Sequence, residues 1–183
     1  MLQLFHNASE NCSRAVTRKY STSFSSAIGL LHRDLRAPIF NIYGFVRLAD
    51  EIVDTFHDFD KKRLLERFKE ETYQSIREGI SLNPILNSFQ ATVNRFNIEN
   101  TLIGQFFKSM EMDLAKISYD DSLFKEYILG SAEVVGLMCL RVFCKGDKEM
   151  FEKLKPYAMS LGSAFQKINF LRDLQADYIG MGR

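Results

Sequence analysis

The sequence has little of what marks several functional classes. Its 24 Lys and Arg residues nearly balance its 23 Asp and Glu residues, and a formal net charge of +1 leaves no basic footprint for nucleic acid. We therefore expect no nucleic-acid partner. The three cysteines, Cys12, Cys139 and Cys144, lack the spacing of a metal site, and the last two lie in an apolar segment where a thiol acts as a small hydrophobe. This cysteine usage fits a reducing cytoplasm.

Long hydrophobic runs are also missing. The longest, residues 134–140, is too short to cross a bilayer, and the start has no basic-then-apolar secretory signal. Strand-like alternation of useful length, an internal repeat and a low-complexity linker are absent as well. We expect a soluble, cytoplasmic protein, which a greasy substrate would keep at the periphery of a membrane.

What the sequence does contain predicts helices. Apolar residues make up 46% of the chain, with 16 Phe among them, which is enough to fill the core of one domain over residues 1–183. We expect a hydroxyl-rich turn over 20–26 and an all-α, single-domain bundle of seven or eight helices. The segments with helical spacing are about 8–19, 38–59, 60–79, 84–96, 99–117, 122–143 and 147–179, the last interrupted at Pro156.

The strongest functional pattern lies between residues 43 and 54. Tyr43, Arg47, Asp50 and Asp54 step by four, three and four residues, so their side chains form one stripe on a helix. The residues beside this stripe are apolar, which predicts a helix that is buried around a polar seam. A buried polar seam needs a ligand or polar partners.

A second stripe lies near the end of the chain, where Gln166, Asn169, Asp173 and Asp177 step by three, four and four residues. If the two helices pack with these faces opposed, four carboxylates and two amides line one cavity. Each close like-charge pair then costs roughly 4 kcal/mol at an effective dielectric of about 20, so cations are needed. Hard oxygen ligands without a His or Cys cluster indicate Mg²⁺, with Mn²⁺ as the alternative, shared with a substrate diphosphate.

The two acidic motifs resemble those of the squalene and phytoene synthase family, the head-to-head isoprenoid synthases. The first family motif, Asp-x-x-x-Asp preceded by Arg, is matched by Arg47, Asp50 and Asp54, in a form most similar to bacterial phytoene synthases. The second motif is Gln-x-x-Asn-x-x-Arg-Asp-x-x-x-Asp. Its matches are Gln166, Asn169, Arg172, Asp173 and Asp177.

The resemblance implies an isoprenoid-synthase-type helical bundle and a role for each matched residue. The implied Mg²⁺ ligands are Asp50, Asp54, Asn169, Asp173 and Asp177. The implied diphosphate contacts are Ser21, Ser23, Tyr43, Arg47, Gln166 and Arg172. The implied catalytic residues are Asp50, Asp54, Asp173, Asp177 and Tyr127. Tyr127 falls at the position of a cavity tyrosine, although Glu133 stands nearby where relatives often have Gly.

The resemblance also bears on how much of the family domain is present. It runs from about residue 14 to the end of the chain, whereas the family continues past Gly-x-Gly-Arg with a turn and several more helices. We therefore expect the chain to hold the N-terminal two-thirds of the family domain and to be truncated at its C-terminus. Whether the chain is active without those helices stays open, as does its oligomeric state.

The implied activity is a Mg²⁺-dependent head-to-head condensation of two prenyl diphosphates with loss of diphosphate. The favoured form joins two geranylgeranyl diphosphates to phytoene, in carotenoid biosynthesis. Squalene or dehydrosqualene synthesis from farnesyl diphosphate is one alternative, and because no nicotinamide motif is present, NADPH is not expected. A terpene cyclase or chain-elongating prenyltransferase usually begins its motif with Asp-Asp, where this chain has Asp50 and Glu51. A non-catalytic helical assembly or binding relative is the alternative of another class.

Asp113 is the remaining acidic residue beside a predicted apolar helix face. A lone Asp in that position is more often a solvated or capping residue than a ligand.

Overall fold

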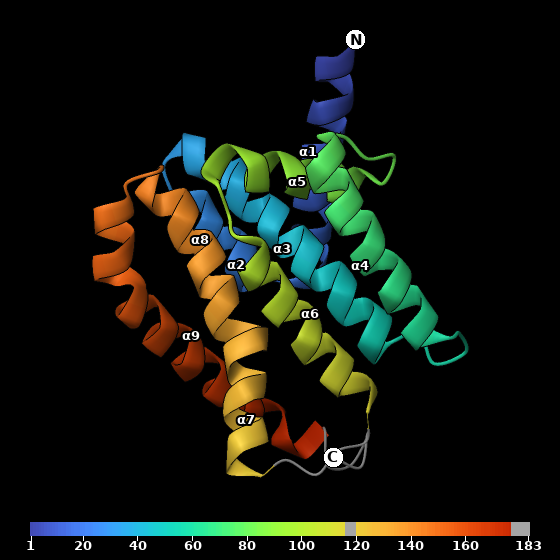
Figure 1. Cartoon of the computed structure of the whole chain (residues 1–183), viewed down its shortest axis with the longest axis vertical. Coiled ribbons are helices and arrows are strands. Elements are labelled where there is room, and N and C mark those ends of the chain that lie inside the picture. The colour runs from blue at the N-terminus through green and yellow to red at the C-terminus, as the bar shows by residue number, and fades with distance from the viewer. Residues whose placement is uncertain (116–119, 177–183) are drawn as a thin grey trace.

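The chain folds as a bundle of helices, as predicted (Figure 1). The structure is a computed structural model that describes residues 1–115 and 120–176, the last five of these by their backbone path alone. Over these residues it contains nine α-helices, one π-helical turn and no strand. The elements are α1 (Leu2–Tyr20), α2 (Thr22–Leu30), α3 (Arg33–Asp54), α4 (Lys61–Glu78), α5 (Pro84–Phe96), α6 (Asn100–Leu114), α7 (Asp121–Ile128), the π-helix η1 (Leu129–Glu133), α8 (Val134–Cys144) and α9 (Lys148–Ala176).

Side-chain caps set several helix starts where the sequence predicts them. The carboxylate of Asp60 accepts a hydrogen bond from the Arg63 backbone N–H at 3.0 Å and begins α4. Asn83 caps α5 in the same way, with Pro84 at the first helical position. Gly79 ends α4 with φ 71°, a left-handed conformation that suits glycine. The predicted helices over 60–79 and 84–96 are therefore confirmed within one or two residues.

Other predicted bounds are wrong. The predicted turn over 20–26 is a single break at Ser21, whose hydroxyl caps α2 by accepting from the Phe24 backbone N–H at 3.2 Å. The first helix begins at Leu2, and the central helix ends at Asp54, before the predicted residue 59. The last helix passes through Pro156 without interruption, because α9 packs along α8 and η1, and such tertiary contacts override local propensity.

The core is built around Phe45 on α3, which is fully buried. Its ring stacks on Phe89 of α5 with centroids 3.8 Å apart, and it meets Phe68 of α4 at 5.6 Å and Phe107 of α6 at 5.7 Å. Three helices thus hold one face of α3. This packing fixes the rotation of α3 about its axis and with it the direction of the polar stripe.

The segment from α7 to α8 forms one continuous helical rod with the π-turn η1 in its middle (Figure 1). By length and composition this rod, Asp121–Cys144, could cross a membrane, although 44% of its most apolar stretch is buried inside the protein. The sequence prediction did not identify this segment, because it considered only the unbroken apolar run 134–140. Val134, Leu137 and Met138 belong to the buried core, so the rod has the burial pattern of a core helix.

One side of α9 is apolar and exposed. Tyr157, Leu161, Phe165 and Ile168 expose 71%, 58%, 57% and 60% of their surface, and they follow one another at helical spacing. We call these four residues the α9 apolar face. Because α9 packs on α8 and η1 through its other side, the face is accessible to a further helix or chain.

Candidate functional site

The polar stripe of α3 lies in a partly buried position, as predicted. Tyr43, Arg47, Asp50 and Asp54 are all half-buried. The residues beside the stripe are mostly buried: Phe45, Ala49, Ile52 and Val53 are each less than 9% exposed. The predicted buried helix with a polar seam is therefore confirmed. The polar groups of the seam are thus partly shielded from solvent but not fully buried.

Asp50 is the most strongly perturbed group of this seam. Burial raises the pKa of its carboxyl, the charge of Asp54 raises it further, and Asp113 adds to the effect against the opposing charge of Arg47. The resulting pKa of Asp50 is about 7, compared with 3.8 ordinarily. The stripe therefore carries more negative than positive charge when its carboxylates are ionised.

Arg47 is fixed by two neighbours. Its Nη2 donates a 2.5 Å hydrogen bond to Oε2 of Glu51, and its guanidinium carbon lies 4.5 Å from the ring centroid of Tyr20. Burial raises the pKa of Glu51, but the hydrogen bonds with Arg47, Thr55 and Tyr20 and the charge of Arg47 together lower it by more, so the pKa lies below its usual value. The buried Nε–H of Arg47 has no acceptor among the described residues. This donor is therefore available to an anionic ligand.

The start of α2 reaches the same stripe. The Ser21 side chain hydrogen-bonds Tyr43, and the ring of Phe24 lies 5.5 Å from the ring of Tyr43. Burial raises the pKa of the Tyr43 hydroxyl, with Ser21 and Arg47 acting in the opposite direction. The hydroxyl of Ser23 lies 3.3 Å from that of Ser21. The structure thus places the two predicted serines beside the tyrosine and arginine of the stripe.

Tyr127 reaches the site from α7. Its hydroxyl donates a hydrogen bond to Oδ2 of Asp113 on α6 at 3.1 Å, and its ring centroid lies 6.0 Å from that of Phe170 on α9. Asp113 is half-buried and its charge acts on Asp50. The expectation of a solvated or capping residue therefore does not describe Asp113, which belongs to the surroundings of the first acidic stripe.

The second stripe is carried by α9. Gln166 and Asn169 are half-buried there. Arg172 and Asp173 lie on the same helix with side chains outside the described part of the chain, and Asp177 lies outside the described residues. Both α3 and α9 pack on α8. That the two acidic stripes face each other stays a prediction.

The oxygen donors of the first stripe imply a metal ion. Among the described side chains no three His, Cys, Asp or Glu residues are grouped as a metal site. The first stripe nevertheless supplies two carboxylates, Asp50 and Asp54; burial raises the pKa of Asp50, and the charge of Asp54 raises it further. Crowded, hard oxygen donors of this kind fit Mg²⁺, which takes few protein ligands and leaves positions for a substrate phosphate.

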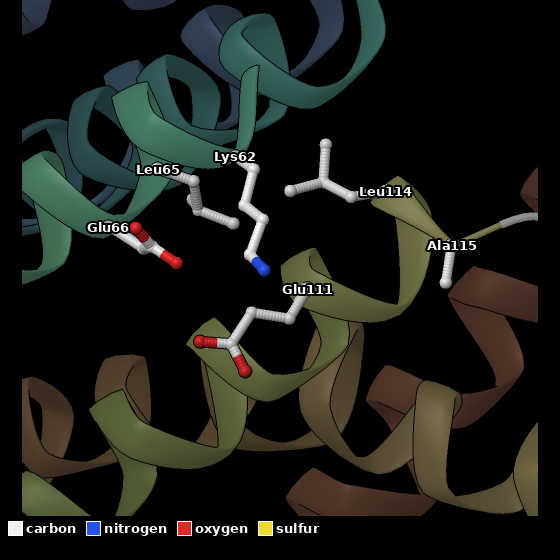
Figure 2. Close-up of a pocket in the computed structure, with 6 residues that line it drawn as sticks. All are labelled: Lys62, Leu65, Glu66, Glu111, Leu114 and Ala115. Carbon is white, nitrogen blue, oxygen red and sulfur yellow. The ribbon is translucent and has the colours of Figure 1, made fainter. Parts of the chain in front are cut away.

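A surface hollow lies between α4 and α6 (Figure 2). The charged side chains Lys62, Glu66 and Glu111 line much of it, and Glu111 also forms an ion pair with Lys69 at 2.7 Å. Charged walls are unsuited to the hydrocarbon chain of a lipid-like substrate because desolvating them is costly. We assign this hollow no part in the site.

Two residues of the site are missing from the sequence prediction, Glu51 and Asp113. Glu51 follows Arg47 by four residues on one helix, and this spacing is a signal that could have identified the ion pair. Asp113 carried no such signal. It reaches Tyr127 and Asp50 only because α6 packs against α3 and α7, and that packing is a property of the fold.

Comparison with known proteins places the chain among isoprenoid synthases. A family model described as squalene/phytoene synthase matches residues 17–183. The chain is 26% identical to a 4,4'-diapophytoene synthase of Staphylococcus haemolyticus, over 89% of this chain and 57% of the relative. It is 28% identical to a phytoene synthase of Cereibacter sphaeroides, over 90% of this chain and 48% of the relative. It thus spans about half the length of these curated relatives.

The fold is also that of a solved structure. A squalene synthase from Alicyclobacillus acidocaldarius superposes with a TM-score of 0.84 at 24% sequence identity, covering 97% of this chain and 65% of the other. At this identity the likeness establishes the fold. The predicted isoprenoid-synthase-type bundle is therefore confirmed.

Proposed function

Because the chain belongs to the squalene/phytoene synthase family, we propose that it catalyses the Mg²⁺-dependent head-to-head condensation of two prenyl diphosphates. In the form we favour, two geranylgeranyl diphosphates give phytoene and two diphosphates, a step of carotenoid biosynthesis. The phytoene synthase among its relatives supports this choice. We place the protein in the cytoplasm, in peripheral contact with the membrane that receives its apolar product.

The observation that carries the proposal is the crowding of carboxylates at Asp50. Burial raises the pKa of Asp50, and the charge of Asp54 on the same stripe raises it further, while the guanidinium of Arg47 opposes both. A site with this excess of buried negative charge is stabilised by a divalent cation, and a cation beside an arginine attracts a diphosphate. The residues of the stripe thus suit a diphosphate–Mg²⁺ complex better than they suit a neutral ligand.

The chemistry begins with ionisation of one allylic diphosphate. The bond between the terminal carbon and oxygen breaks, and its electron pair leaves with the diphosphate. Mg²⁺, when bound through Asp50, Asp54, Asn169, Asp173 and Asp177, would supply positive charge to the departing oxygens. Arg47 and Gln166 would hold the same group, with Ser21, Ser23, Tyr43 and Arg172 as further diphosphate contacts. Apolar walls would keep water from the carbocation.

The second substrate then attacks the cation with its double bond. A new carbon–carbon bond forms, a proton is lost, and a cyclopropyl intermediate results. A second ionisation, rearrangement and proton loss give the symmetrical polyene. Both steps release a proton and need no reductant, which agrees with a product made without NADPH. Tyr127 or the released diphosphate would accept a proton.

A second candidate product comes from the shorter farnesyl diphosphate. The 4,4'-diapophytoene synthase relative favours this alternative, which gives dehydrosqualene, or squalene if a reductant takes part. Side chains that close the far end of the substrate cavity decide between the two chain lengths.

Product analysis tests the proposal. The purified protein is incubated with geranylgeranyl or farnesyl diphosphate and MgCl₂, with and without NADPH, and matched samples contain EDTA. Released diphosphate is quantified, and extracted hydrocarbons are identified by chromatography and mass spectrometry. We expect phytoene from geranylgeranyl diphosphate only when Mg²⁺ is present. A dehydrosqualene or squalene product would support the alternative, and binding without any diphosphate release would support a non-catalytic relative.

A further inference from the structure

Asp113 connects Tyr127 to the first acidic stripe. The Tyr127 hydroxyl donates to Oδ2 of Asp113 at 3.1 Å, which joins α7 to α6. The charge of Asp113 also acts on Asp50 of α3. Asp113 therefore contacts a residue expected to touch substrate and acts through its charge on a residue expected to hold the metal.

The register between α6 and the rod that carries Tyr127 is fixed by a close backbone contact. A Cβ atom added to Gly130 of η1 would lie 2.6 Å from the Gln105 carbonyl oxygen and 2.7 Å from Cβ of Ser109. Gly130 follows Tyr127 by three residues, and Ser109 precedes Asp113 by four, so each pair lies on one face of its helix. The contact that seats Gly130 on α6 therefore also holds Tyr127 opposite Asp113.

The ring of Tyr127 also contacts α9. Phe170 of α9 lies 6.0 Å from it, and Phe170 follows Asn169, a residue of the second motif. The ring is thus supported by α9 while the hydroxyl is held by α6. A tyrosine hydroxyl has one proton to donate, so a hydroxyl that donates to Asp113 can only accept at its remaining positions.

We propose that Asp113 is a positioning residue: by accepting the Tyr127 hydroxyl proton in a hydrogen bond, it turns the Tyr127 oxygen toward the substrate as an acceptor. The inference rests on the proposed condensation, in which developing positive charge on the prenyl chain is stabilised by acceptor oxygens. Asp113 acts through Tyr127 and is itself neither a diphosphate contact nor a metal ligand.

The test compares three variants with wild type in steady-state kinetics. In Asp113→Ala the acceptor is lost, and we expect kcat to fall about 10- to 100-fold with KM nearly unchanged, as for a group displaced by about an ångström. In Asp113→Asn an amide oxygen can still accept the hydroxyl proton, and we expect kcat within about threefold of wild type. Tyr127→Phe should resemble Asp113→Ala, and the double variant should be no worse than either single variant.

Two readouts separate positioning from other roles. The rise in melting temperature produced by MgCl₂ with pyrophosphate should be the same in Asp113→Ala as in wild type. Without ligand, the drop in melting temperature of the double variant should be smaller than the sum of the single drops, because both remove one hydrogen bond. Glu111→Gln, which changes a carboxylate on α6 that pairs with Lys69, is the matched control and should leave kcat unchanged.

Defined outcomes would overturn the inference. If Asp113→Asn is as slow as Asp113→Ala, or if Asp113→Ala loses the Mg²⁺–pyrophosphate effect, the charge of Asp113 matters and the positioning role is wrong. If Asp113→Ala does not fold, Asp113→Asn and Tyr127→Phe still decide the matter, because positioning requires the first to be active and the second to be slow. An inactive wild type would overturn the proposed function together with this inference, whereas an active wild type with a fully active Asp113→Ala would overturn this inference alone.

Discussion

Glu51 accepts a 2.5 Å hydrogen bond from Nη2 of Arg47, one helical turn earlier on α3, in a place where the two side chains are only 16% and 25% exposed. We predict that Glu51→Gln lowers the free energy of unfolding by about 1.5–3 kcal/mol, the range for a hydrogen bond between charged groups. The reason is that the variant leaves a guanidinium in a partly buried place without its counter-charge. Chemical denaturation monitored by circular dichroism measures the change.

The chain offers a matched control for this pair. Arg67 and Glu71 stand at the same spacing on α4, but their side chains are 69% and 45% exposed and their charged atoms are 3.6 Å apart. Glu71→Gln should change the free energy of unfolding by less than about 0.5 kcal/mol. Equal effects of the two substitutions would show that the α3 pair contributes no more than a surface ion pair.

Asp50 makes the stability of the protein depend on pH. Its pKa is raised from 3.8 to about 7, so between these values the folded protein binds a proton that the unfolded chain has released. The extra free energy of unfolding that this proton provides is fully present below about pH 4. It is lost as pH rises toward 7, and in metal-free buffer the loss reaches up to about 4 kcal/mol. Asp50→Asn cannot ionise and should be more stable than wild type at pH 8.

The measurement is a set of urea denaturations in EDTA at pH 4.5, 6 and 8. The difference between wild type and Asp50→Asn should grow in favour of the variant as pH rises. Asp58→Asn, at an exposed position after α3, is the control and should track wild type across the series. A difference that does not vary with pH would contradict the raised pKa of Asp50.

Gly130 has a packing role that Gly29 lacks. Adding a Cβ at Gly130 brings atoms within 2.6 Å of the α6 backbone, whereas at Gly29 of α2 nothing lies within 4 Å. Gly130→Ala should therefore lower the free energy of unfolding by about 1–3 kcal/mol through overpacking. Gly29→Ala, in the last turn of α2, should raise it by about 0.5–1 kcal/mol. Thermal unfolding of both variants measures the contrast, and a neutral Gly130→Ala would contradict the close seating of η1 on α6.

The α9 apolar face should bind hydrophobic probes. Because its four side chains are more than half exposed, we expect strong fluorescence of anilinonaphthalene sulfonate with the native protein. Changing Leu161 and Phe165 to Gln should reduce that fluorescence and leave the melting temperature nearly unchanged, since little buried area is lost. Leu137→Gln, in the core at 3% exposure, is the contrasting variant and should lower the melting temperature sharply. Undiminished fluorescence in the double variant would place the probe site elsewhere.

Local signals in the sequence predict most of the helical architecture. Asp60, Asn83 and Asp120 are capping residues, and each stands at the start of a helix in the structure. The stripe of Tyr43, Arg47, Asp50 and Asp54 follows from their spacing, because steps of three and four residues place side chains on one face of a helix. The motif, most helix starts and the polar seam are therefore local properties of the chain.

What the sequence could not predict depends on tertiary packing. The π-turn between Tyr127 and Val134 has no local signature, and α9 continues through Pro156 because α8 and η1 support it. Asp113 became part of the site through contacts among α3, α6 and α7. Sequence spacing finds groups that share a helix, whereas it has no access to groups that meet across helices.

The central claim is that the carboxylates of α3 hold a metal-bound diphosphate while it leaves the substrate. Its most direct test is the rate of diphosphate release from geranylgeranyl or farnesyl diphosphate by wild type and by Asp50→Asn, with and without MgCl₂, after unfolding curves have shown that both proteins are folded. The account predicts Mg²⁺-dependent release by wild type and a loss of most of that release in Asp50→Asn. Equal release by the two proteins would contradict it.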